Sequence, residues 1–476
     1  MALCDGCDFF EAEGYTSWDP RIISDTRVHR SHFMVKITHM HIISVKYFPK
    51  GESHMGLLDD LYASSKNKTM WDSNDLFVNY TTGLLPLDYA NGFWMTMRDE
   101  NGKKKMVAVP GILGGKMILM FGSTGSGKTT LACQMAYSII KPFEDGLFFL
   151  IDTEHTALKE RICQITTMEP DDNRLRLVED HTSIEDVLEM INEVCKAKEE
   201  GGDQYKYTVM NRSYDGKPFK YYVPTVFVID SLREFSSRDM TTTDLGSNMD
   251  GARGARDTAW FLDKVLLNMQ KYNIVLICTN HIQPKIDVNP YAPPPRGLIM
   301  MPQTETLPKG QRPLFLAHTA IRCNAIKSNI YTKDDVGFDG MMVTLQLAKS
   351  KTNFIGATLN VALNAKIGFD PIFTMYEFAQ QCKLIQGRNP NLFLPGMEDK
   401  KFSRKNFREK MVTDREFNRR FMETMRPYLE ALIGTKEATE DENIKYGDYV
   451  SLDTITEEDT IIEDTALPTE LDEKTA

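Results

Sequence analysis

From about residue 80 to residue 390, two patterns of apolar and polar positions take turns along the chain. Short apolar runs rich in β-forming residues are KMILMFG, GLFFLID, TVFVIDS and IVLICTN. Between them lie segments with helical periodicity, TTLACQMAYSII, IEDVLEMINEVCKA and DTAWFLDKVLLNMQKY. Strands that alternate with amphipathic helices are typical of β-α-β units. The pattern therefore predicts an α/β fold with a doubly wound, mostly parallel sheet.

Two segments interrupt this alternation. The run YKYTVMNRSYDGKPFKYYV has an Asp215-Gly216 turn between β-prone stretches, which predicts an inserted hairpin near residues 203–223. Residues 282–315 are rich in proline and lack helical periodicity, so their length favours a functional loop. Beyond this loop, MMVTLQLAKSK and ATLNVALNAK predict further strands, and TMYEFAQQCKLI predicts a helix.

Composition divides the chain into four parts. Residues 1–75 are rich in aromatic residues and histidine and predict a small accessory domain, for which we expect a role in polymerisation. Residues 76–390 form the expected α/β core, and residues 391–434 a small basic region. Residues 435–476 are acidic and lack apolar periodicity, which is typical of a disordered tail.

The charge of the chain is distributed unevenly. The 476 residues include 56 Lys+Arg and 67 Asp+Glu, a net charge of −11. The last 42 residues hold fourteen acids and three lysines, so they alone account for −11, and the body carries 53 charges of each sign. A neutral body can bind a polyanion only through local basic clusters.

Several classes of protein are excluded by composition. No stretch approaches the ~18 uninterrupted apolar residues of a membrane span, and the acidic N-terminus has no apolar signal region. Cysteines such as Cys133 and Cys278 lie in core-like runs without framework spacing, which is typical of reduced thiols. We expect a soluble cytoplasmic protein without a membrane partner.

A glycine-rich motif follows the first apolar run. Residues 122–129 read GSTGSGKT and fit the pattern G-x-x-x-x-G-K-[ST] between a strand and a helix. Backbone N–H groups of such a loop surround phosphates, Lys128 reaches the β- and γ-phosphates, and Thr129 can ligate Mg²⁺. The motif predicts a P-loop that binds ATP and Mg²⁺. Its expected nucleotide contacts are Gly122, Ser123, Thr124, Gly125, Ser126, Gly127, Lys128, Thr129 and Thr130.

Acidic residues end two of the predicted strands. Asp230 ends the run VFVID, where a carboxylate is unfavourable unless it serves a site, so we predict a Walker-B role in holding Mg²⁺. Asp152 and Glu154 end the run GLFFLID, and ligands of open α/β sheets bind beyond the carboxyl ends of strands. Glu154 could there orient and deprotonate water. The alternatives are a surface acid in a turn for Glu154 and a helix-capping role for Asp152.

The order of the motifs resembles that of RecA-type recombinases, closest to the phage UvsX-like branch. TGLLPLDYANG, the glycine-rich motif, IDTEH, FVIDS, ICTNH and LAKSK follow one another over residues 80–390. The resemblance implies a RecA-like P-loop ATPase core in which Glu154 is the catalytic glutamate. It also implies that His281 occupies the place of a γ-phosphate sensor, where RecA has Gln and UvsX has His. A strand-end histidine with a structural role is the alternative.

A pair of lysines, separated by one residue, lies at the end of a predicted strand. Lys349 and Lys351 are two positions apart and so point to one face. By resemblance they match the lysine pair that reaches the ATP of a neighbouring subunit and stabilises phosphoryl transfer in trans, whereas solvated strand-end lysines are the alternative. The family's adenine contacts are not matched by HTALKERI, so base recognition is not carried over.

RecA-type proteins bind DNA with two loops, which correspond to residues 236–256 and 282–315. Arg253 and Arg256, three apart at a helix start, suit a phosphate contact. The second loop has basic residues among apolar ones that could wedge between bases, and a Pro-rich insertion without DNA contacts is the alternative. These residues are Lys285, Arg296, Lys309 and Arg312, with Ile299, Met300 and Met301.

A third basic segment lies near the end of the body. Residues 400–420 contain nine basic and three acidic residues, which suits a surface that captures duplex DNA. A solvated helix face is the alternative for such a run.

The resemblance implies an ATP-dependent DNA strand-exchange recombinase that acts in homologous recombination and repair. Its expected partners are single- and double-stranded DNA, further copies in a helical filament with ATP between subunits, and loading or mediator proteins. If the chain is phage-encoded, it would act in the host bacterial cytoplasm. A ring-forming replicative helicase and a KaiC-type regulatory ATPase that does not bind DNA are the alternatives. The TGLLPLD and DTEH elements favour the recombinase over the helicase, and the basic loops disfavour the regulator.

Overall fold

The computed structural model describes residues 77–98, 104–179, 182–209, 218–242, 250–284, 301–302 and 304–434. All of them belong to the unit Met1–Gly434, and the second unit, Thr435–Ala476, lies outside the described residues. The accessory domain predicted for residues 1–75 also lies outside them. Among the helices of the described ranges, none has both the length and the apolar composition that crossing a bilayer requires.

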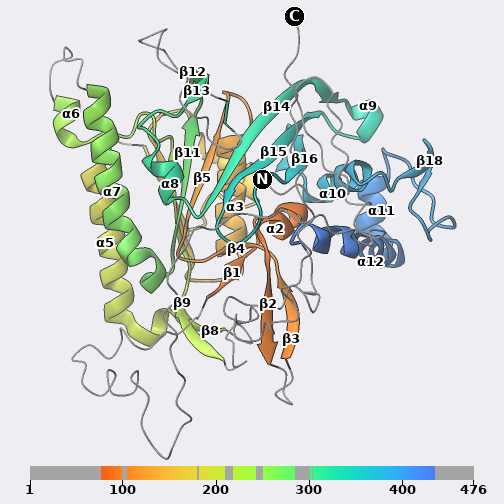
Figure 1. Ribbon diagram of the computed structural model, residues 1–476, viewed down its shortest axis with the longest axis horizontal. Coiled ribbons are helices and arrows are strands. Elements are labelled where there is room, and N and C mark those ends of the chain that lie inside the picture. The colour runs from red at the N-terminus through yellow and green to blue at the C-terminus, as the bar shows by residue number, and fades with distance from the viewer. Residues whose placement is uncertain are drawn as a thin grey trace, which may run out of the picture. The chain divides into compact units, whose positions relative to one another are not determined.

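A nine-stranded mixed sheet organises the fold (Figure 1). In spatial order its strands are β17 (Gly368–Phe369), β16 (Thr358–Asn364), β15 (Gly340–Ser350), β14 (Thr319–Tyr331), β5 (Met117–Gly122), β11 (Ile274–His281), β10 (Thr225–Asp230), β6 (Leu147–Asp152) and β7 (Leu175–Val178). The six strands from β14 to β7 are parallel, and β15 to β17 extend the sheet with antiparallel pairs. The prediction of an α/β fold with a large, mostly parallel sheet is confirmed.

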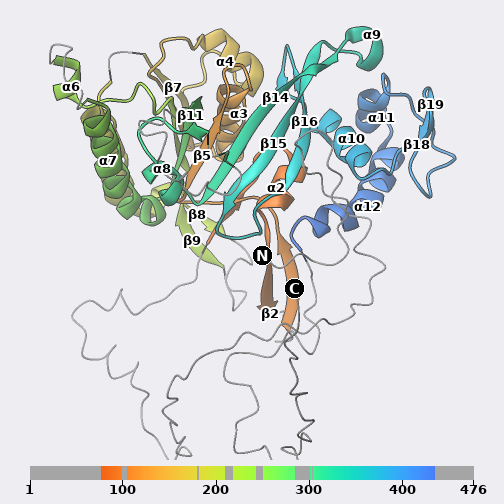
Figure 2. The ribbon, with the colours of Figure 1, turned by 45° about the horizontal axis from the view of Figure 1, so that its top comes forward.

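Helices cover both faces of the sheet, as the continuous apolar runs require. Every residue of β5 and β10 is buried, which is expected of strands packed on two sides. One face packs against α2 (Leu85–Asn91), α3 (Lys128–Ile140), α4 (Lys159–Thr166), α9 (Lys333–Val336), α10 (Pro371–Gln381), α11 (Phe407–Thr413) and α12 (Arg415–Ala431). The other face packs against α5 (Ile184–Gly201), α7 (Asp250–Tyr272) and α8 (Arg312–Leu316). Figure 2 shows α7 and α10 to α12 on opposite sides of the molecule.

Small two-stranded sheets surround the main sheet. The pairs are β1 (Asn79–Tyr80) with β4 (Ile112–Leu113), β2 (Phe93–Arg98) with β3 (Lys104–Val109), β8 (Lys206–Val209) with β9 (Phe219–Tyr222), β12 (Gln283–Pro284) with β13 (Glu305–Thr306), and β18 (Gln386–Arg388) with β19 (Asn391–Phe393). The β8–β9 pair is the hairpin that the sequence predicts. The β12–β13 pair brings two parts of the 282–315 segment side by side.

The C-terminal helices share the core of the main sheet. Phe402, Phe407, Phe417 and Phe421 are buried and belong to the same hydrophobic cluster as α3 and α10. Phe407 contacts the ring of Tyr376 in α10, with ring centroids 5.4 Å apart. The short helix α6 (Arg238–Thr242) and the 3-10 turn Gly202–Tyr205 complete the described elements.

Candidate functional site

The glycine-rich segment forms a tight loop between β5 and α3. Gly125 and Gly127 have φ angles of 76° and 81°, a left-handed conformation that is strained for residues with a Cβ. A Cβ on Gly125 would meet no atom within 4 Å, so the loop is open at this residue. Unpaired N–H groups at the start of a 13-residue helix favour a bound anion, and this loop leads directly into such a helix.

The Lys128 ammonium group folds back over the loop. Its Nζ donates hydrogen bonds to the carbonyl oxygens of Ser123 (2.8 Å) and Gly122 (3.2 Å). Burial lowers the pKa of Lys128, and the nearby Asp230 and Glu154 carboxylates act in the opposite direction. The loop therefore holds a cation next to two acidic side chains.

Asp230 ends β10 and is buried beside two hydroxyl groups. Thr279 of β11 donates to its carboxylate, and the Thr129 hydroxyl at the start of α3 is a second partner. Burial raises the pKa of Asp230, and repulsion from Glu154 and Asp152 adds to this, while the two hydroxyl groups lower the pKa. A buried carboxylate near two others is a position that a cation would stabilise.

Glu154 lies in the turn after β6 and has two side-chain partners. Ser231 Oγ donates to Glu154 Oε1 at 2.7 Å, and His281 Nε2 lies 2.8 Å from the same oxygen. Burial favours the protonated acid, but the hydrogen bonds from Ser231 and His281 and the charge of Lys128 outweigh it, so the pKa of Glu154 is lowered. Glu154 is therefore a carboxylate at neutral pH, and the 30% exposure of its side chain leaves room for water to donate to it.

Asp152 organises the turn that carries Glu154. Its carboxylate accepts hydrogen bonds from the backbone N–H groups of Ala157 (2.7 Å) and Glu154 (3.2 Å). The helix-capping alternative for Asp152 is wrong, because α4 begins at Lys159 after Leu158 and has no side-chain cap. Asp152 instead holds the turn in which Glu154 faces the site.

Four neighbouring strands bring these groups together. β5, β11, β10 and β6 are parallel, with His281 opposite Gly122 and Asp230 opposite Asp152. The carboxyl ends of parallel strands meet at one edge of a sheet. The structure therefore gathers, at one edge, the predicted site residues Lys128, Thr129, Asp230, Glu154 and His281.

The residues at this edge fit a nucleoside triphosphate with a magnesium ion. The open loop and the Lys128 ammonium group suit phosphate oxygens. The Thr129 hydroxyl and the Asp230 carboxylate are oxygen donors of the kind that Mg²⁺ prefers. The described residues contain no cluster of three His, Cys, Asp or Glu that could hold a metal, so Mg²⁺ here would need phosphate and water as further ligands.

The residue next to His281 holds the loop that follows. Asn280 is fully buried, and its Nδ2 donates to the carbonyl oxygen of Pro308 at 3.0 Å, while its Oδ1 accepts from the His281 backbone N–H at 2.9 Å. Arg322 of β14 pairs with Glu305 at 2.9 Å. The described end of the 282–315 segment is thus attached both to β11, which ends at the site, and to β14, which passes beside it.

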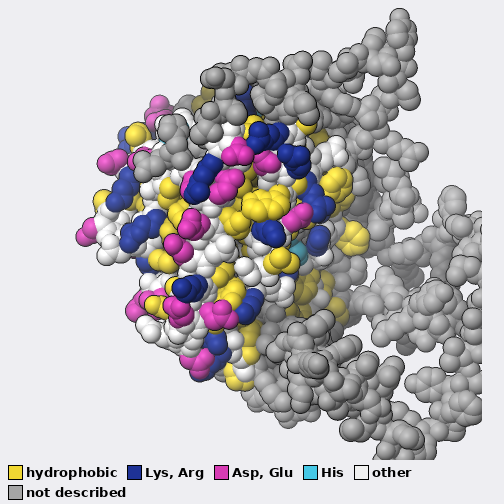
Figure 3. All heavy atoms as spheres, turned by 90° about the vertical axis from the view of Figure 1, so that its left-hand side faces the viewer, with side chains coloured by type: hydrophobic (Ala, Val, Ile, Leu, Met, Phe, Trp, Pro, Cys, Tyr) yellow, Lys and Arg dark blue, Asp and Glu magenta, His cyan; other side chains and the backbone are white. Residues whose placement is uncertain are grey.

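The predicted DNA contacts of α7 differ in exposure. Arg253 pairs with Asp239 at 3.0 Å and exposes 35% of its side chain, whereas Arg256 makes only a long contact of 3.9 Å with Asp257 and exposes 78%. Figure 3 shows acidic and basic side chains interspersed on the face that carries α5 and α7. Lys285 and Arg296 of the second predicted loop lie outside the described residues.

The described part of the second loop packs against the first. Lys309 is half-buried, and its Nζ lies 3.4 Å from Ser236 Oγ at the start of the 236–256 segment. Arg312 pairs with Asp263 at 2.7 Å. Met301, which we expected at an apolar loop tip, is instead buried in the hydrophobic cluster that includes α7. Lys309 therefore connects the two predicted loops.

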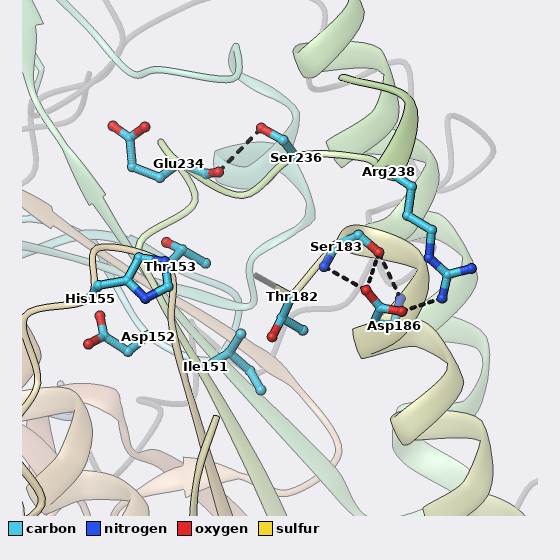
Figure 4. Close-up of a pocket in the computed structure, with 10 residues that line it drawn as sticks. All are labelled: Ile151, Asp152, Thr153, His155, Thr182, Ser183, Asp186, Glu234, Ser236 and Arg238. Atoms are coloured by element: carbon cyan, nitrogen blue, oxygen red, sulfur yellow. Dashed lines mark hydrogen bonds and ion pairs between the residues drawn. The ribbon is translucent and has the colours of Figure 1, made fainter. Parts of the chain in front are cut away.

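A pocket of about 260 Å³ adjoins the turn after β6 (Figure 4). The end of β6, the start of α5 and residues 234–238 line it. Asp186 accepts hydrogen bonds from Ser183 N (2.8 Å) and Oγ (2.5 Å) and pairs with Arg238, and the Arg238 guanidinium is the main cause that lowers the pKa of Asp186 to about 2. The start of the first predicted loop is thus anchored to α5.

Lys349 and Lys351 lie near the amino ends of the parallel strands, whereas the candidate site lies at their carboxyl ends. Because β15 is antiparallel to β14, Ser350 lies opposite Thr319, which in turn lies opposite Ile118 near the start of β5. The glycine-rich loop follows the other end of β5, on the order of 13 Å along the strand at about 3.3 Å per residue. The lysine pair therefore does not join the site of its own chain.

Ion pairs neutralise much of the basic segment 400–420. Three exposed cations of this segment, Lys401, Lys405 and Arg415, have no ion-pair partner within the described ranges. The pairs are Lys400 with Asp414 and Glu416, Arg404 with Glu377, Arg408 with Asp370, Arg419 with Glu423, and Arg420 with Asp399. These contacts favour a structural role for a large part of the segment.

Two hydroxyl groups of the site, those of Ser231 and Thr279, were not predicted from the sequence. Ser231 follows Asp230, and Thr279 precedes Asn280. The only sequence feature that indicated a role for these two hydroxyl groups is their position next to predicted site residues at the ends of strands. In comparisons with known proteins, no family model and no curated protein matches this chain. The function is therefore inferred from the site and from the motifs.

Proposed function

We propose that the protein is an ATP-dependent DNA strand-exchange recombinase that forms filaments on single-stranded DNA in homologous recombination and repair. In this proposal residues 122–129 are the P-loop of a RecA-like core that binds ATP and Mg²⁺. The observation that carries the proposal is the contact between Glu154 and His281. This contact joins Glu154, the predicted catalytic carboxylate, to β11, and β11 leads into the predicted DNA loop of residues 282–315.

Each group at the edge has a role in this reaction. Lys128 binds the β- and γ-phosphates once it exchanges its carbonyl partners for phosphate oxygens. Thr129 and Asp230 would hold Mg²⁺, which would supply positive charge against the charge that develops on the transferred phosphoryl group. The Glu154 carboxylate accepts a hydrogen bond from water and orients it, and Ser231 keeps this carboxylate in position.

His281 would couple the nucleotide site to the predicted DNA loop. A γ-phosphate next to Lys128 competes with Glu154 for the His281 side chain. Any shift of His281 acts on Asn280, whose side chain holds both the His281 N–H and the Pro308 carbonyl. ATP binding and the position of the DNA loops are therefore coupled, and hydrolysis releases that coupling.

The lysine pair requires a second copy of the chain. Lys349 and Lys351 lie at the edge opposite the site, so an action on ATP must occur in trans. A head-to-tail contact of this kind repeats without closing unless its rotation makes a ring, and an open repeat is a helical filament. This is the assembly that the motif resemblance implies.

Electron microscopy of the full chain with ATP and single-stranded DNA tests the proposal. A helical filament supports the recombinase. A closed ring favours a helicase, and particles that do not change when DNA is added favour a regulatory ATPase. The Lys128→Ala variant should lose ATP binding and filaments together. Unchanged ATP hydrolysis in this variant would refute the nucleotide site.

A further inference from the structure

Thr153 fastens the turn after β6 to the turn after β10 with three hydrogen bonds. Its backbone N–H donates to the carbonyl oxygen of Asp230 at 2.9 Å. Its hydroxyl group accepts a hydrogen bond from the backbone N–H of Ser231 and donates one to the carbonyl oxygen of the same residue, each at 2.9 Å. A hydroxyl group has one hydrogen to donate and two lone pairs that accept. The Thr153 side chain can therefore satisfy both backbone polar groups of Ser231.

Ser231 is the residue through which this contact reaches the candidate site. It is fully buried, and its own hydroxyl group donates to Glu154 Oε1 at 2.7 Å. The backbone N–H of the next residue, Leu232, donates to the carbonyl oxygen of Thr279 at 3.0 Å and so ties this turn to β11. In the described part of the chain, Thr153 is the residue whose side chain holds the Ser231 backbone. The direction of the Ser231 hydroxyl group therefore depends on Thr153.

The state of Glu154 depends strongly on this hydrogen bond from Ser231. Burial raises the pKa of Glu154, and among the contacts that lower it the hydrogen bond from Ser231 is the largest, ahead of those of His281 and Lys128. Both hydrogen bonds of the Thr153 hydroxyl group go to the Ser231 backbone. Thr153 thus acts on the Glu154 carboxylate through Ser231.

We propose that Thr153 is a positioning residue for ATP hydrolysis, which holds the Ser231 backbone so that the Ser231 hydroxyl group stays directed at Glu154. The inference rests on the proposed function, which supplies the reaction and the role of Glu154 in orienting water. It adds a residue to which the sequence motifs give no role, although it lies between Asp152 and Glu154 in the turn that Figure 4 shows.

Burial of Ser231 explains why the loss of one hydroxyl group should affect the reaction. The Ser231 N–H and carbonyl groups would both lose this partner, and a buried polar group without a partner is costly. The turn would therefore shift to find other partners, and the Ser231 hydroxyl group would shift with it. Displacing a group near the reacting atoms by about 1 Å can slow a reaction on the order of a hundredfold.

Two variants separate the hydroxyl group of Thr153 from its shape. Valine keeps the branched shape without the hydroxyl group, whereas serine keeps the hydroxyl group without the methyl group. In the full chain with ATP, Mg²⁺ and single-stranded DNA, Thr153→Val should lower kcat by roughly ten- to a hundredfold. ATP binding should stay within about threefold of wild type, because the lost contact acts on the chemical step. Thr153→Ser should restore kcat to within about threefold of wild type.

Ser231→Ala tests whether Thr153 acts through Ser231. This variant should also lower kcat, because Glu154 loses the same hydrogen bond. Adding Thr153→Val to Ser231→Ala should then reduce kcat by no more than about a further twofold, since the hydroxyl group that Thr153 directs is already gone. A role of Thr153 that is unrelated to Ser231 would instead lower kcat by the same factor in both backgrounds.

Thr166→Val is the matched control. Thr166 is buried, and its hydroxyl group donates within its own helix, α4, to the carbonyl oxygen of Ile162 at 2.6 Å. Losing this hydrogen bond should lower the thermal midpoint of unfolding, as Thr153→Val does, and leave kcat at the wild-type value. The comparison separates an effect on the reaction from a loss of stability.

Normal hydrolysis by Thr153→Val, an equal loss in Thr153→Ser, or an undiminished further loss in the Ser231→Ala background would each overturn the inference. ATP binding checks that the variants fold. If Thr153→Val does not fold, Thr153→Ala takes its place, because it also lacks the hydroxyl group. In all of these cases hydrolysis by the wild-type chain would leave the proposed function standing. A wild-type chain that does not hydrolyse ATP would overturn both.

Discussion

Glu154 is held as a carboxylate by its neighbours, and this limits the chemistry it can perform. Hydrogen bonds from Ser231 and His281 stabilise the ionised form against the effect of burial. A carboxylate with a lowered pKa is a weak base, so in the proposed reaction Glu154 would orient water more than it would remove a proton early. How well Glu154 would orient water depends on the direction of its carboxylate, which the hydrogen bonds with Ser231 and His281 fix.

The Glu154→Gln variant should therefore bind ATP but turn it over slowly. The amide retains the size of the side chain and loses the charge that attracts a water proton. We expect hydrolysis to fall by roughly 10² to 10⁴-fold, with ATP-bound filaments that persist on DNA. A phosphate-release assay and a nucleotide-binding assay on the same sample separate the two steps. Normal turnover would remove Glu154 from the mechanism.

Asp88 is a buried carboxylate far in sequence from the site. It accepts hydrogen bonds from the hydroxyl groups of Thr81 (2.6 Å) and Thr82 (2.5 Å) and from the Thr82 N–H (2.6 Å). Burial outweighs these hydrogen bonds and raises the pKa of Asp88 to about 6. Folding thus favours the protonated acid. This contribution to stability is complete below about pH 4 and is lost as the pH rises through about 6.

Asp88→Asn should remove this pH dependence, because the amide is neutral throughout. One pKa unit corresponds to about 1.4 kcal/mol, so the variant should gain on the order of 3 kcal/mol relative to wild type between pH 4 and pH 7. Urea unfolding of both proteins at several pH values in this range measures the difference. A difference that does not change with pH would show that Asp88 is ionised in the folded protein over the whole range.

At the scale of elements, the central strands could be predicted and the outer ones less well. β5, β6, β10 and β11 are continuous apolar runs, because helices cover both of their faces. β14 has irregular pairing with β15 between Ala320 and Ile321 and again between Ala325 and Ile330. A break in register can change which face of the sheet a side chain lies on, so a strand of this kind need not show a single alternation in its sequence.

The same distinction applies to the candidate site. Lys128 could be predicted from the glycine-rich motif, and Asp230 and Glu154 from their positions at the ends of apolar runs. The contacts of Ser231 with Glu154 and of Thr279 with Asp230 depend on which strands are neighbours. Strand order is set by how the helices cross the sheet, and the local sequence does not encode it.

The short connection from β11 to the loop that follows leads to a prediction about coupling. Asn280→Ala removes the hydrogen bond to Pro308 and the support of the His281 backbone. Hydrolysis without DNA should remain within about threefold of wild type, whereas stimulation by single-stranded DNA should fall by about tenfold or more. ATP hydrolysis at increasing DNA concentration measures both.

Asn91→Ala is the matched control for this prediction. Asn91 is also buried and also donates to one backbone carbonyl, that of Leu87 in α2 at 2.9 Å. Loss of either hydrogen bond should cost stability on the order of 1 kcal/mol. Only the Asn280 variant should lose DNA stimulation. Equal losses in both variants would point to general destabilisation.

At the scale of the whole molecule, the neutral charge of the body would limit where the proposed DNA partner binds. Arg253 and Arg312 have acidic partners, and several cations of the 400–420 segment do as well. Among the described residues of the predicted DNA-binding segments, Arg256, which makes only a 3.9 Å contact with Asp257, and the exposed Lys401, Lys405 and Arg415 are the cations most open to a phosphate. Because few cations of these described segments lack an acidic partner, a large negative charge elsewhere in the same chain should compete with DNA for them.

The tail of residues 435–476 supplies such a charge, with a net value of −11. We expect it to compete with duplex DNA for Lys401, Lys405 and Arg415, the exposed cations of the 400–420 segment. Deleting the tail should strengthen duplex binding at low salt, and the gain should vanish as salt screens both partners. Since each phosphate contact contributes a slope of about 0.9, deletion should steepen the salt dependence of log affinity by at most roughly three. Titrations of labelled duplex at several salt concentrations measure this slope. An equal gain from deletion in a Lys401→Ala, Lys405→Ala, Arg415→Ala variant would place the competing surface elsewhere.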